Sequence, residues 1–149
     1  MKTVLVDLDG TLSDNSHRAH LINKKITNPP KWDDFYLASG NDSPNNSVIE
    51  VVRGLKKLGY GIHIFSGRGK IAFDITINWL IKYKVPYDQI TMREIGDYTE
   101  DYVLKRKWLE FYYPNYRNQI LCVFDDRNSV VDMWRAVGIV CFQVNYGDF

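Results

Sequence analysis

The chain has 149 residues, of which 45% are hydrophobic and 25% charged, and its formal net charge is +1. This length provides for one hydrophobic core but not for two substantial domains, and the apolar content excludes a disordered chain. A net charge near zero gives no general attraction for nucleic acid, so contact with a polyanion requires a local basic patch. We therefore predict one globular domain over residues 1–149.

The N-terminus and the cysteines favour a cytoplasmic protein. One lysine and a short apolar run precede the first aspartates, which is too little for a signal peptide or a membrane span. Cys122 and Cys141 lie inside apolar runs, where a free thiol behaves as a small hydrophobe. The sequence contains no C-x-x-C zinc pattern and no G-x-x-x-x-G-K-[ST] phosphate loop. We expect reduced core cysteines and no ATP site of the P-loop kind.

Strand-like runs alternate with helical patterns along the chain. The strand-like runs are rich in β-branched and apolar residues and occupy residues 3–8, 60–65, 90–93, 120–124 and 139–144. The helical patterns, with apolar residues at helical spacing, occupy residues 46–58, 71–83, 100–112 and 129–137. This alternation predicts an α/β fold with a parallel sheet of about five strands and helices on both faces. Residues 13–46 show no long periodic element and are expected to form a loop-rich flap.

Polar residues follow or flank several of these runs. In order along the chain they are Asp7 and Asp9, Ser66-Gly67-Arg68, Asp101 and Lys105, and Asp125-Asp126. Ligands of open parallel sheets bind at the carboxyl ends of the strands. We therefore expect these side chains to converge on one edge of the sheet, open to solvent because no covering domain is predicted.

Asp7 and Asp9 form the most informative pair. Residues i and i+2 of a strand share a face, and Gly10 allows the chain to turn directly afterwards. Two such carboxylates suit a nucleophile and a proton donor, or ligands for a hard cation such as Mg2+. In isolation, D-x-D-G is equally typical of a strand-ending turn or part of a calcium loop.

The other motifs also have plain structural interpretations. Asp125-Asp126 is typical of a helix cap, Ser66-Gly67 of a turn, and Asp101 with Lys105 of an exposed i,i+4 ion pair. Three of the four tryptophans lie within apolar helical patterns, which favours a core role. Trp32, in the flap, is the exception and a candidate base-stacking residue.

The order of these motifs resembles the haloacid dehalogenase (HAD) superfamily of aspartate-based phosphatases across the whole chain. The motifs are D-x-D-G-T, S-G-R, a downstream lysine and D-D. More narrowly, the chain resembles the 3'-phosphatase domain of phage-type polynucleotide kinase/phosphatase, without a kinase domain. This narrower likeness rests on residues of which several lie outside the general motifs, among them Arg18, Met92-Arg93, Gly96-Asp97, residues 101–105, 130–135 and Gly147-Asp148-Phe149.

The resemblance implies a Rossmann-like HAD fold with a minimal or absent cap, and catalytic roles for four residues. Asp7 would be the nucleophile that forms an aspartyl-phosphate, with a role as mere metal ligand as the competing interpretation. Asp9 would donate and then accept the proton, which requires a raised pKa in the resting enzyme. Ser66 would donate a hydrogen bond to a phosphate oxygen, and Lys105 would neutralise its charge.

The resemblance also implies a metal and a substrate site. Mg2+ would be held by Asp7, by Asp9 through its main-chain carbonyl, and by the Asp125-Asp126 pair. The substrate-binding set comprises Arg18, Ser66, Gly67, Arg68, Asp101 and Lys105. Within this set Asp101 is expected to hold Lys105 from one helical turn away, and the role of Arg127 stays open.

These expectations describe a Mg2+-dependent phosphomonoester hydrolase that removes 3'-terminal phosphates from DNA or RNA ends. A separate kinase or ligase is an expected partner, and no membrane is involved. A mononucleotide or small-metabolite phosphatase would use the same catalytic residues. A phospho-accepting receiver module is disfavoured because the candidate nucleophile follows the first strand, and a non-catalytic nucleic-acid-binding domain because the net charge is near zero.

Overall fold

The five predicted strands form one parallel sheet in the computed structural model, which describes all 149 residues. The strands are β1 (Thr3–Val6), β4 (Gly61–Gly69), β5 (Gln89–Arg93), β6 (Ile120–Asp125) and β7 (Cys141–Gln143). Their order across the sheet is β5-β4-β1-β6-β7, and all neighbours run parallel. The carboxyl end of β1, the central strand, therefore lies between those of β4 and β6.

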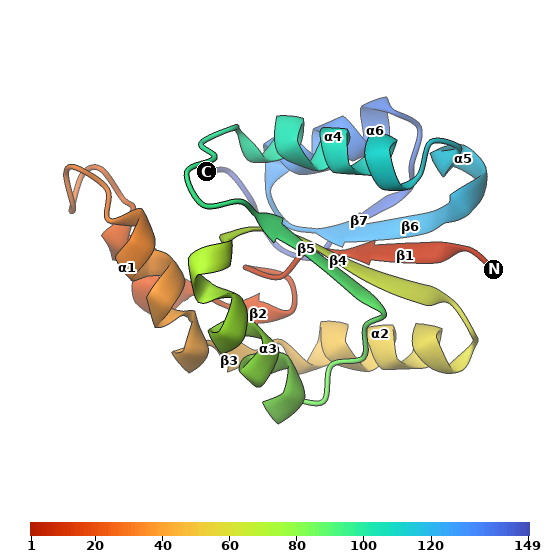
Figure 1. Cartoon of the computed structure of the whole chain (residues 1–149), viewed down its shortest axis with the longest axis horizontal. Helices are drawn as coiled ribbons and strands as arrows, with labels where there is room; N and C mark the ends of the chain where they lie inside the picture. Colours follow the sequence, from red (N-terminus) through yellow and green to blue (C-terminus); the bar gives the residue numbers. More distant parts are fainter.

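Helices cover both faces of the sheet, as the alternating pattern predicts (Figure 1). One face carries α2 (Asn46–Lys57) and α3 (Phe73–Lys82), and the other carries α4 (Asp101–Tyr112) and α6 (Asn128–Ala136). The short helix α5 (Tyr116–Gln119) precedes β6. None of these helices combines the length and hydrophobicity needed to cross a bilayer.

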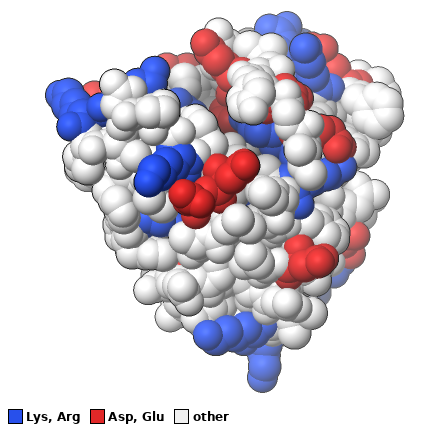
Figure 2. All heavy atoms as spheres, turned by 60° about the vertical axis from the view of Figure 1, so that its left-hand side comes forward, with Lys and Arg blue, Asp and Glu red and all other residues white.

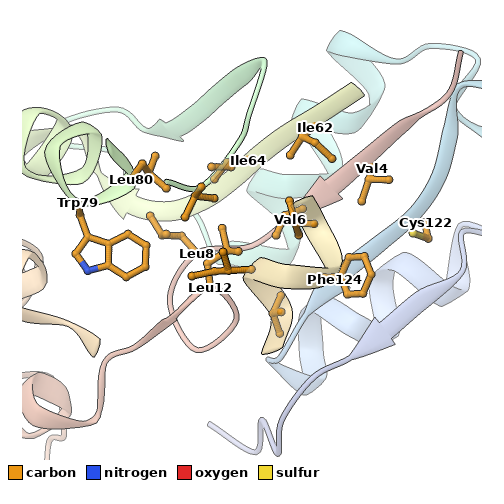
Figure 3. Close-up of a cluster of buried hydrophobic side chains, with 14 residues drawn as sticks. Val4, Val6, Leu8, Leu12, Ile62, Ile64, Trp79, Leu80, Cys122 and Phe124 are labelled. Carbon is orange, nitrogen blue, oxygen red and sulfur yellow. The ribbon is translucent and has the colours of Figure 1, made fainter. Parts of the chain in front are cut away.

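Two hydrophobic clusters fix the sheet between its helical layers. Val4 and Val6 of β1 point into the cluster shared with α2 and α3, where Trp79 and Phe124 also lie (Figure 3). Leu5 points to the opposite face, into a cluster with α4 and α6. This alternation is the period of two that a strand imposes, and burial on both faces explains why β1 is an uninterrupted apolar run. Both cysteines are free and buried, as expected.

The expected flap contains only short elements. They are β2 (Ser13–Asp14), the 3-10 helix η1 (Ser16–Leu21), α1 (Trp32–Leu37), the 3-10 helix η2 (Ala38–Asn41) and β3 (Ser43–Pro44). β2 and β3 pair antiparallel. Figure 1 shows α1 beyond the carboxyl ends of the strands. The sequence does not reveal α1 because six residues are too few to display a helical period.

Strand β4 is longer than predicted and changes the setting of one motif. It continues to Gly69 instead of ending at residue 65, so Ser66-Gly67-Arg68 lies within the strand and does not follow it. The pairing register with β5 shifts between Ser66 and Gly69. The irregular span includes Gly67, where the absence of a side chain lets the backbone deviate. A 3-10 helix, η3 (Lys70–Ala72), then connects to α3.

Candidate active site

Three buried carboxylates meet at the carboxyl ends of β1 and β6. Oxygen atoms of Asp7, Asp125 and Asp126 lie within 4.8 Å of one another. Burial, followed by the charge of Asp125, raises the pKa of Asp7 well above its ordinary value. The same two causes raise the pKa of Asp126 to about 6. The cluster therefore carries more negative charge than its surroundings neutralise.

Lys105 supplies the one ammonium in this cluster. Its Nζ donates to Asp7 Oδ1 at 2.8 Å and to Asp125 Oδ2 at 3.0 Å, and the side chain is buried. Burial alone would lower the pKa of Lys105, but the charges of Asp125 and Asp7 outweigh it and raise the pKa. The lysine is thus held as a cation directly beside Asp7, as predicted.

The remaining negative charge fits a hard cation such as Mg2+, because every donor in the cluster is a carboxylate oxygen. The two oxygens of Asp125 are already occupied: Oδ2 also accepts from Trp134 Nε1 at 3.2 Å, and Oδ1 accepts from the Asp126 amide at 2.9 Å. Asp126, in contrast, forms no ion pair with a lysine or arginine. Its carboxylate is the better placed of the two for direct coordination.

Gly10 keeps the approach to Asp126 clear. Its φ of +79° is a conformation that favours glycine, and a Cβ built there would lie 2.0 Å from Asp126 Oδ2. The glycine of D-x-D-G therefore has two roles, since it turns the chain after Asp9 and it leaves space for the carboxylate.

The carboxylate of Asp9 points away from the acidic cluster, toward two arginines. Arg18 Nη2 donates to Asp9 Oδ1 at 2.6 Å, and Arg68 Nη2 donates to the same oxygen. Burial alone would raise the pKa of Asp9, but the two guanidinium groups more than compensate and lower it. The expectation of a raised pKa in the resting enzyme is therefore wrong, because both cations that surround Asp9 favour its ionised form.

A residue that sequence reasoning missed, Asp42, completes this arrangement. Its fully buried carboxylate accepts from Arg18 Nε at 2.8 Å, from Arg18 Nη2 at 2.7 Å, from Ser13 Oγ at 3.1 Å and from His17 Nε2 at 2.7 Å. Asp42 thus fixes Arg18 in the orientation that grips Asp9. The sequence carries no signal for this role, because Asp42 lies in a Gly/Asn/Asp/Ser/Pro stretch that is typical of a turn.

The two arginines do not occupy equivalent positions. Both are only 1% exposed, but Arg68 lines the cavity described below and Arg18 does not. Arg68 Nη1 donates to Thr76 Oγ1 at 2.9 Å, while its Nε has no partner. Arg68 remains a candidate substrate contact. Arg18 hydrogen-bonds to Asp9, to Asp42 and to a flap carbonyl, so its direct contact with the substrate stays a prediction.

Ser66 and Gly67 lie in β4 beside the central strand. Ser66 is fully buried, and its Oγ accepts the backbone N–H of Arg68 at 3.1 Å. Gly67 lines the cavity, and a Cβ at this position would lie 2.5 Å from Asp101 Oδ1. The glycine is therefore required for the close approach of Asp101.

Asp101 does not form the predicted ion pair with Lys105. Its Oδ1 accepts from Arg93 Nη2, and its Oδ2 accepts from Arg127 Nη1 at 2.9 Å. Lys105 instead reaches Asp7 and Asp125, because a side chain of the buried face of α4 points to the sheet. The open role of Arg127 is thereby clarified: it binds Asp101 and the Phe149 carbonyl, and not the Asp125-Asp126 pair.

A cavity of about 1120 Å³ extends from Asp7 and Asp126 to the flap and to the loop after β5. Asp9, Arg68, Asp101 and Lys105 also line it. Figure 2 shows acidic and basic side chains interspersed on this side of the molecule, without a continuous basic surface. The structure thus brings most of the predicted residues to one opening, as the topology of a parallel sheet requires.

Comparison with known proteins places this site in a family. The chain matches the family model "Polynucleotide kinase PNKP phosphatase domain" over residues 1–149. It is 33% identical over 140 residues to the "Putative bifunctional polynucleotide kinase/RNA ligase" of Autographa californica nuclear polyhedrosis virus, which covers 93% of this chain and 18% of that protein. The chain thus spans a minor part of this relative.

Two solved structures resemble the chain, one in sequence and fold and the other in fold alone. A chain in the structure of the Pnkp1/Rnl/Hen1 RNA repair complex superposes with a TM-score of 0.82 at 34% identity, covering 99% of this chain and 43% of that chain. A haloacid dehalogenase-like hydrolase from Streptococcus pneumoniae superposes with a TM-score of 0.61 at 14% identity, covering 96% and 84% of the two chains, which shows the shared fold alone. With the family match extending over residues 1–149, the protein belongs to the phosphatase-domain family of polynucleotide kinase PNKP and is a phosphomonoester hydrolase of the HAD fold.

Proposed function

We propose that this protein removes 3'-terminal phosphates from DNA or RNA ends by a Mg2+-dependent reaction through an aspartyl-phosphate on Asp7. The observation that carries the proposal is the position of Asp7 at the base of the cavity, between the Lys105 ammonium and two further carboxylates. Asp7, Asp126 and Asp125 would hold Mg2+, with the Asp9 main-chain carbonyl as the further expected ligand. When bound, Mg2+ would offset the repulsion between the carboxylates and the substrate phosphate.

In the first displacement, a carboxylate oxygen of Asp7 attacks phosphorus and the bond between phosphorus and the 3'-oxygen breaks. Lys105 stabilises the charge of the phosphoryl group, and Asp9 gives its proton to the departing oxygen. In the second displacement, water attacks phosphorus, Asp9 takes the proton and Asp7 is released. Because its pKa is lowered, resting Asp9 is ionised and ready to accept the proton in the second displacement. To donate a proton in the first displacement, Asp9 must be protonated, which requires that the substrate phosphate draws a guanidinium away from it.

Two relatives support the substrate class. One is a polynucleotide kinase/RNA ligase and another belongs to an RNA repair complex. Nucleic-acid end repair, in the cytoplasm and together with a separate kinase or ligase, is therefore the function that we propose for this chain.

The direct test is phosphate release from oligonucleotides with 3'-phosphate, 5'-phosphate or 2',3'-cyclic phosphate ends, with Mg2+ and with a chelator. We expect multiple turnovers on the 3'-phosphate with Mg2+, and none for Asp7→Asn. A labelled phosphoenzyme should accumulate in Asp9→Asn and be absent in Asp7→Asn. Labelling of Asp7→Asn would contradict the assignment of the nucleophile.

One observation favours a smaller substrate. The outer cavity is lined by acidic side chains, namely Asp33, Asp34, Glu94, Asp97 and Glu100, which repel a long polyanion. A mononucleotide phosphatase is therefore the second candidate. Comparable catalytic efficiency on 3'-dTMP and on a 3'-phosphorylated oligonucleotide would support it and contradict polynucleotide specificity.

A further inference from the structure

The cavity extends well beyond the space that a phosphate group occupies, and aromatic side chains line its outer part. Trp32 and Tyr36 belong to α1 in the flap, Tyr98 to the loop after β5 and Tyr102 to α4, and Phe149 is the last residue. Trp32 is 42% exposed and Tyr98 86%, so these rings face solvent and not a core. The reaction proposed above uses none of them.

The charges around these rings disfavour binding through the phosphodiester backbone. Lys31, Arg93 and Arg127 line the cavity together with these five acidic residues, and both arginines are already paired with Asp101. An extended nucleic-acid backbone would meet net repulsion there. A neutral ring that stacks on the aromatic side chains would not, because stacking requires only a flat apolar face.

Trp32 and Tyr36 form an aromatic platform of two rings, tilted by 35° to each other, in the cavity that also holds Asp7. They are one helical turn apart on α1, and their ring centroids are 5.8 Å apart. The ring of Tyr36 lies on the backbone of Gly69, where a Cβ would come within 2.9 Å of Cδ2 and Cε2. Tyr36 lines the same cavity as Asp9, Arg93 and Asp101, and burial raises the pKa of its hydroxyl to about 12.

The platform is also supported from behind. The buried ring of Phe35 packs edge-on against Trp32 with centroids 5.9 Å apart. The Arg18 guanidinium lies 4.2 Å from the centroid of the same Phe35 ring. Trp32 is therefore held by the residues that also fix Arg18, so little ordering is needed when a ligand stacks on it.

We propose that Trp32 and Tyr36 form a stacking subsite for the terminal base of the substrate, which binds the nucleoside whose phosphate lies at Asp7. This inference rests on the proposed function, and it adds that the enzyme recognises a base and not only a phosphate. The terminal base stacks on Trp32, and Tyr36 adjoins Trp32 on the side of Gly69. Because every base has a flat face, the subsite does not discriminate between sequences.

The kinetic test compares two oligonucleotides with the same 3'-phosphate, one ending in thymidine and one in an abasic residue. We expect the wild-type protein to prefer the thymidine end by about five- to 150-fold in kcat/KM, the range that one base–aromatic stack provides. Trp32→Ala should abolish most of this preference, whereas Trp32→Phe should retain it. Phe111→Ala, on an exposed aromatic residue of α4 outside the cavity, is the matched control.

A binding test separates this inference from the proposed function, because it needs no turnover. Trp79 and Trp134 are buried, and Trp32 is the tryptophan exposed in the cavity. Titration of Asp7→Asn with a 3'-phosphorylated thymidine oligonucleotide should quench tryptophan fluorescence, and Asp7→Asn/Trp32→Phe should lose that quench. Absence of quenching at saturation, or an equal loss of rate on thymidine and abasic ends in Trp32→Ala, would overturn the subsite. If the wild type released no phosphate from any oligonucleotide, the proposed function would fail, and the quench would still decide the subsite.

Discussion

At the scale of single residues, charge balance accounts for the geometry around Asp9. Two buried arginines, Arg18 and Arg68, are neutralised by two carboxylates, Asp9 and Asp42. Removing one partner from such a group leaves a buried charge uncompensated. Asp9, the proposed proton carrier, is therefore oriented through Arg18 by Asp42, which lies far from it in the sequence.

Asp42→Asn should lower the free energy of unfolding by about 3–5 kcal/mol, because one guanidinium loses its counter-charge while the shape of the side chain is kept. Urea denaturation measures the effect. Asp132→Asn, on the exposed face of α6, is the matched control and should change stability by less than about 0.5 kcal/mol. A loss of less than about 1 kcal/mol in Asp42→Asn would show that the arginines find other partners.

Gly10→Ala and Gly96→Ala form a matched pair. Their φ angles are +79° and +82°, so both variants bear a similar backbone cost of about 1 kcal/mol. Only at Gly10 does the new Cβ meet Asp126, because nothing lies within 4 Å of a Cβ at Gly96. We expect Gly10→Ala to raise the Mg2+ concentration needed for half-maximal activity at least about tenfold, and Gly96→Ala to leave it unchanged. Equal Mg2+ dependence in the two variants would contradict the role of Gly10.

The sequence predicts the residues of the acidic cluster because each ends or follows an apolar strand, or points inward from a helix. Asp7, Lys105 and Asp125-Asp126 are brought together accordingly. The partners of Asp101 were not predictable from i,i+4 spacing, since Arg93 and Arg127 reach it from other elements. The lowered pKa of Asp9 depends in the same way on contacts across the fold.

At the scale of elements, apolar periodicity locates the five strands and the four long helices, and it fails where elements are short or irregular. The six residues of α1 and the extension of β4 through Ser66 to Gly69 depend on packing of the flap against the sheet. Within β4, His63 is a polar residue at a buried position. Its Nδ1 is 2.7 Å from the Tyr113 hydroxyl and its Nε2 is 2.8 Å from Thr91 Oγ1.

Burial lowers the pKa of His63 to about 4 from its ordinary value near 6.5. Between these values the unfolded chain binds a proton that the folded protein does not bind, so stability falls as the pH falls through this window. From pH 7 to pH 5 this group should cost about 2 kcal/mol. In His63→Gln, the loss of stability over the same range, measured by urea denaturation, should be smaller by that amount. An identical pH dependence in the variant and the wild type would exclude this role.

At the scale of the whole molecule, the near-neutral net charge conceals an acidic centre. The cluster of Asp7, Asp125 and Asp126 opposes folding through its mutual repulsion, so a bound cation should stabilise the entire domain. Mg2+ at ten times its dissociation constant should add about 1.4 kcal/mol to the free energy of unfolding. Thermal unfolding with Mg2+ and with a chelator measures this. Asp126→Asn should be insensitive to Mg2+, and a stabilisation equal to that of the wild type would refute its role as ligand.

The interspersed surface charges also predict that kcat/KM on an oligonucleotide depends only weakly on salt concentration. With one or two backbone phosphates near basic groups, log(kcat/KM) on a single-stranded 3'-phosphorylated oligonucleotide should fall against log(salt) with a slope of about −1. A slope steeper than about −3 would indicate extended backbone contact and contradict binding dominated by stacking. Assays between low and physiological salt at constant Mg2+ give the slope.

The flap joins the sheet through charged groups as well as apolar ones. Arg18 and Asp42 both belong to the flap. Asp9 belongs to the connection that follows β1, and Arg68 belongs to β4. A shortened enzyme that lacked residues 13–44 would therefore not simply gain a wider entrance. It would retain the Asp9–Arg68 ion pair but lose the hydrogen bonds that Arg18 and Asp42 make to it, so attempts to broaden the substrate range by trimming should alter the tip of the flap and keep its two charged anchors.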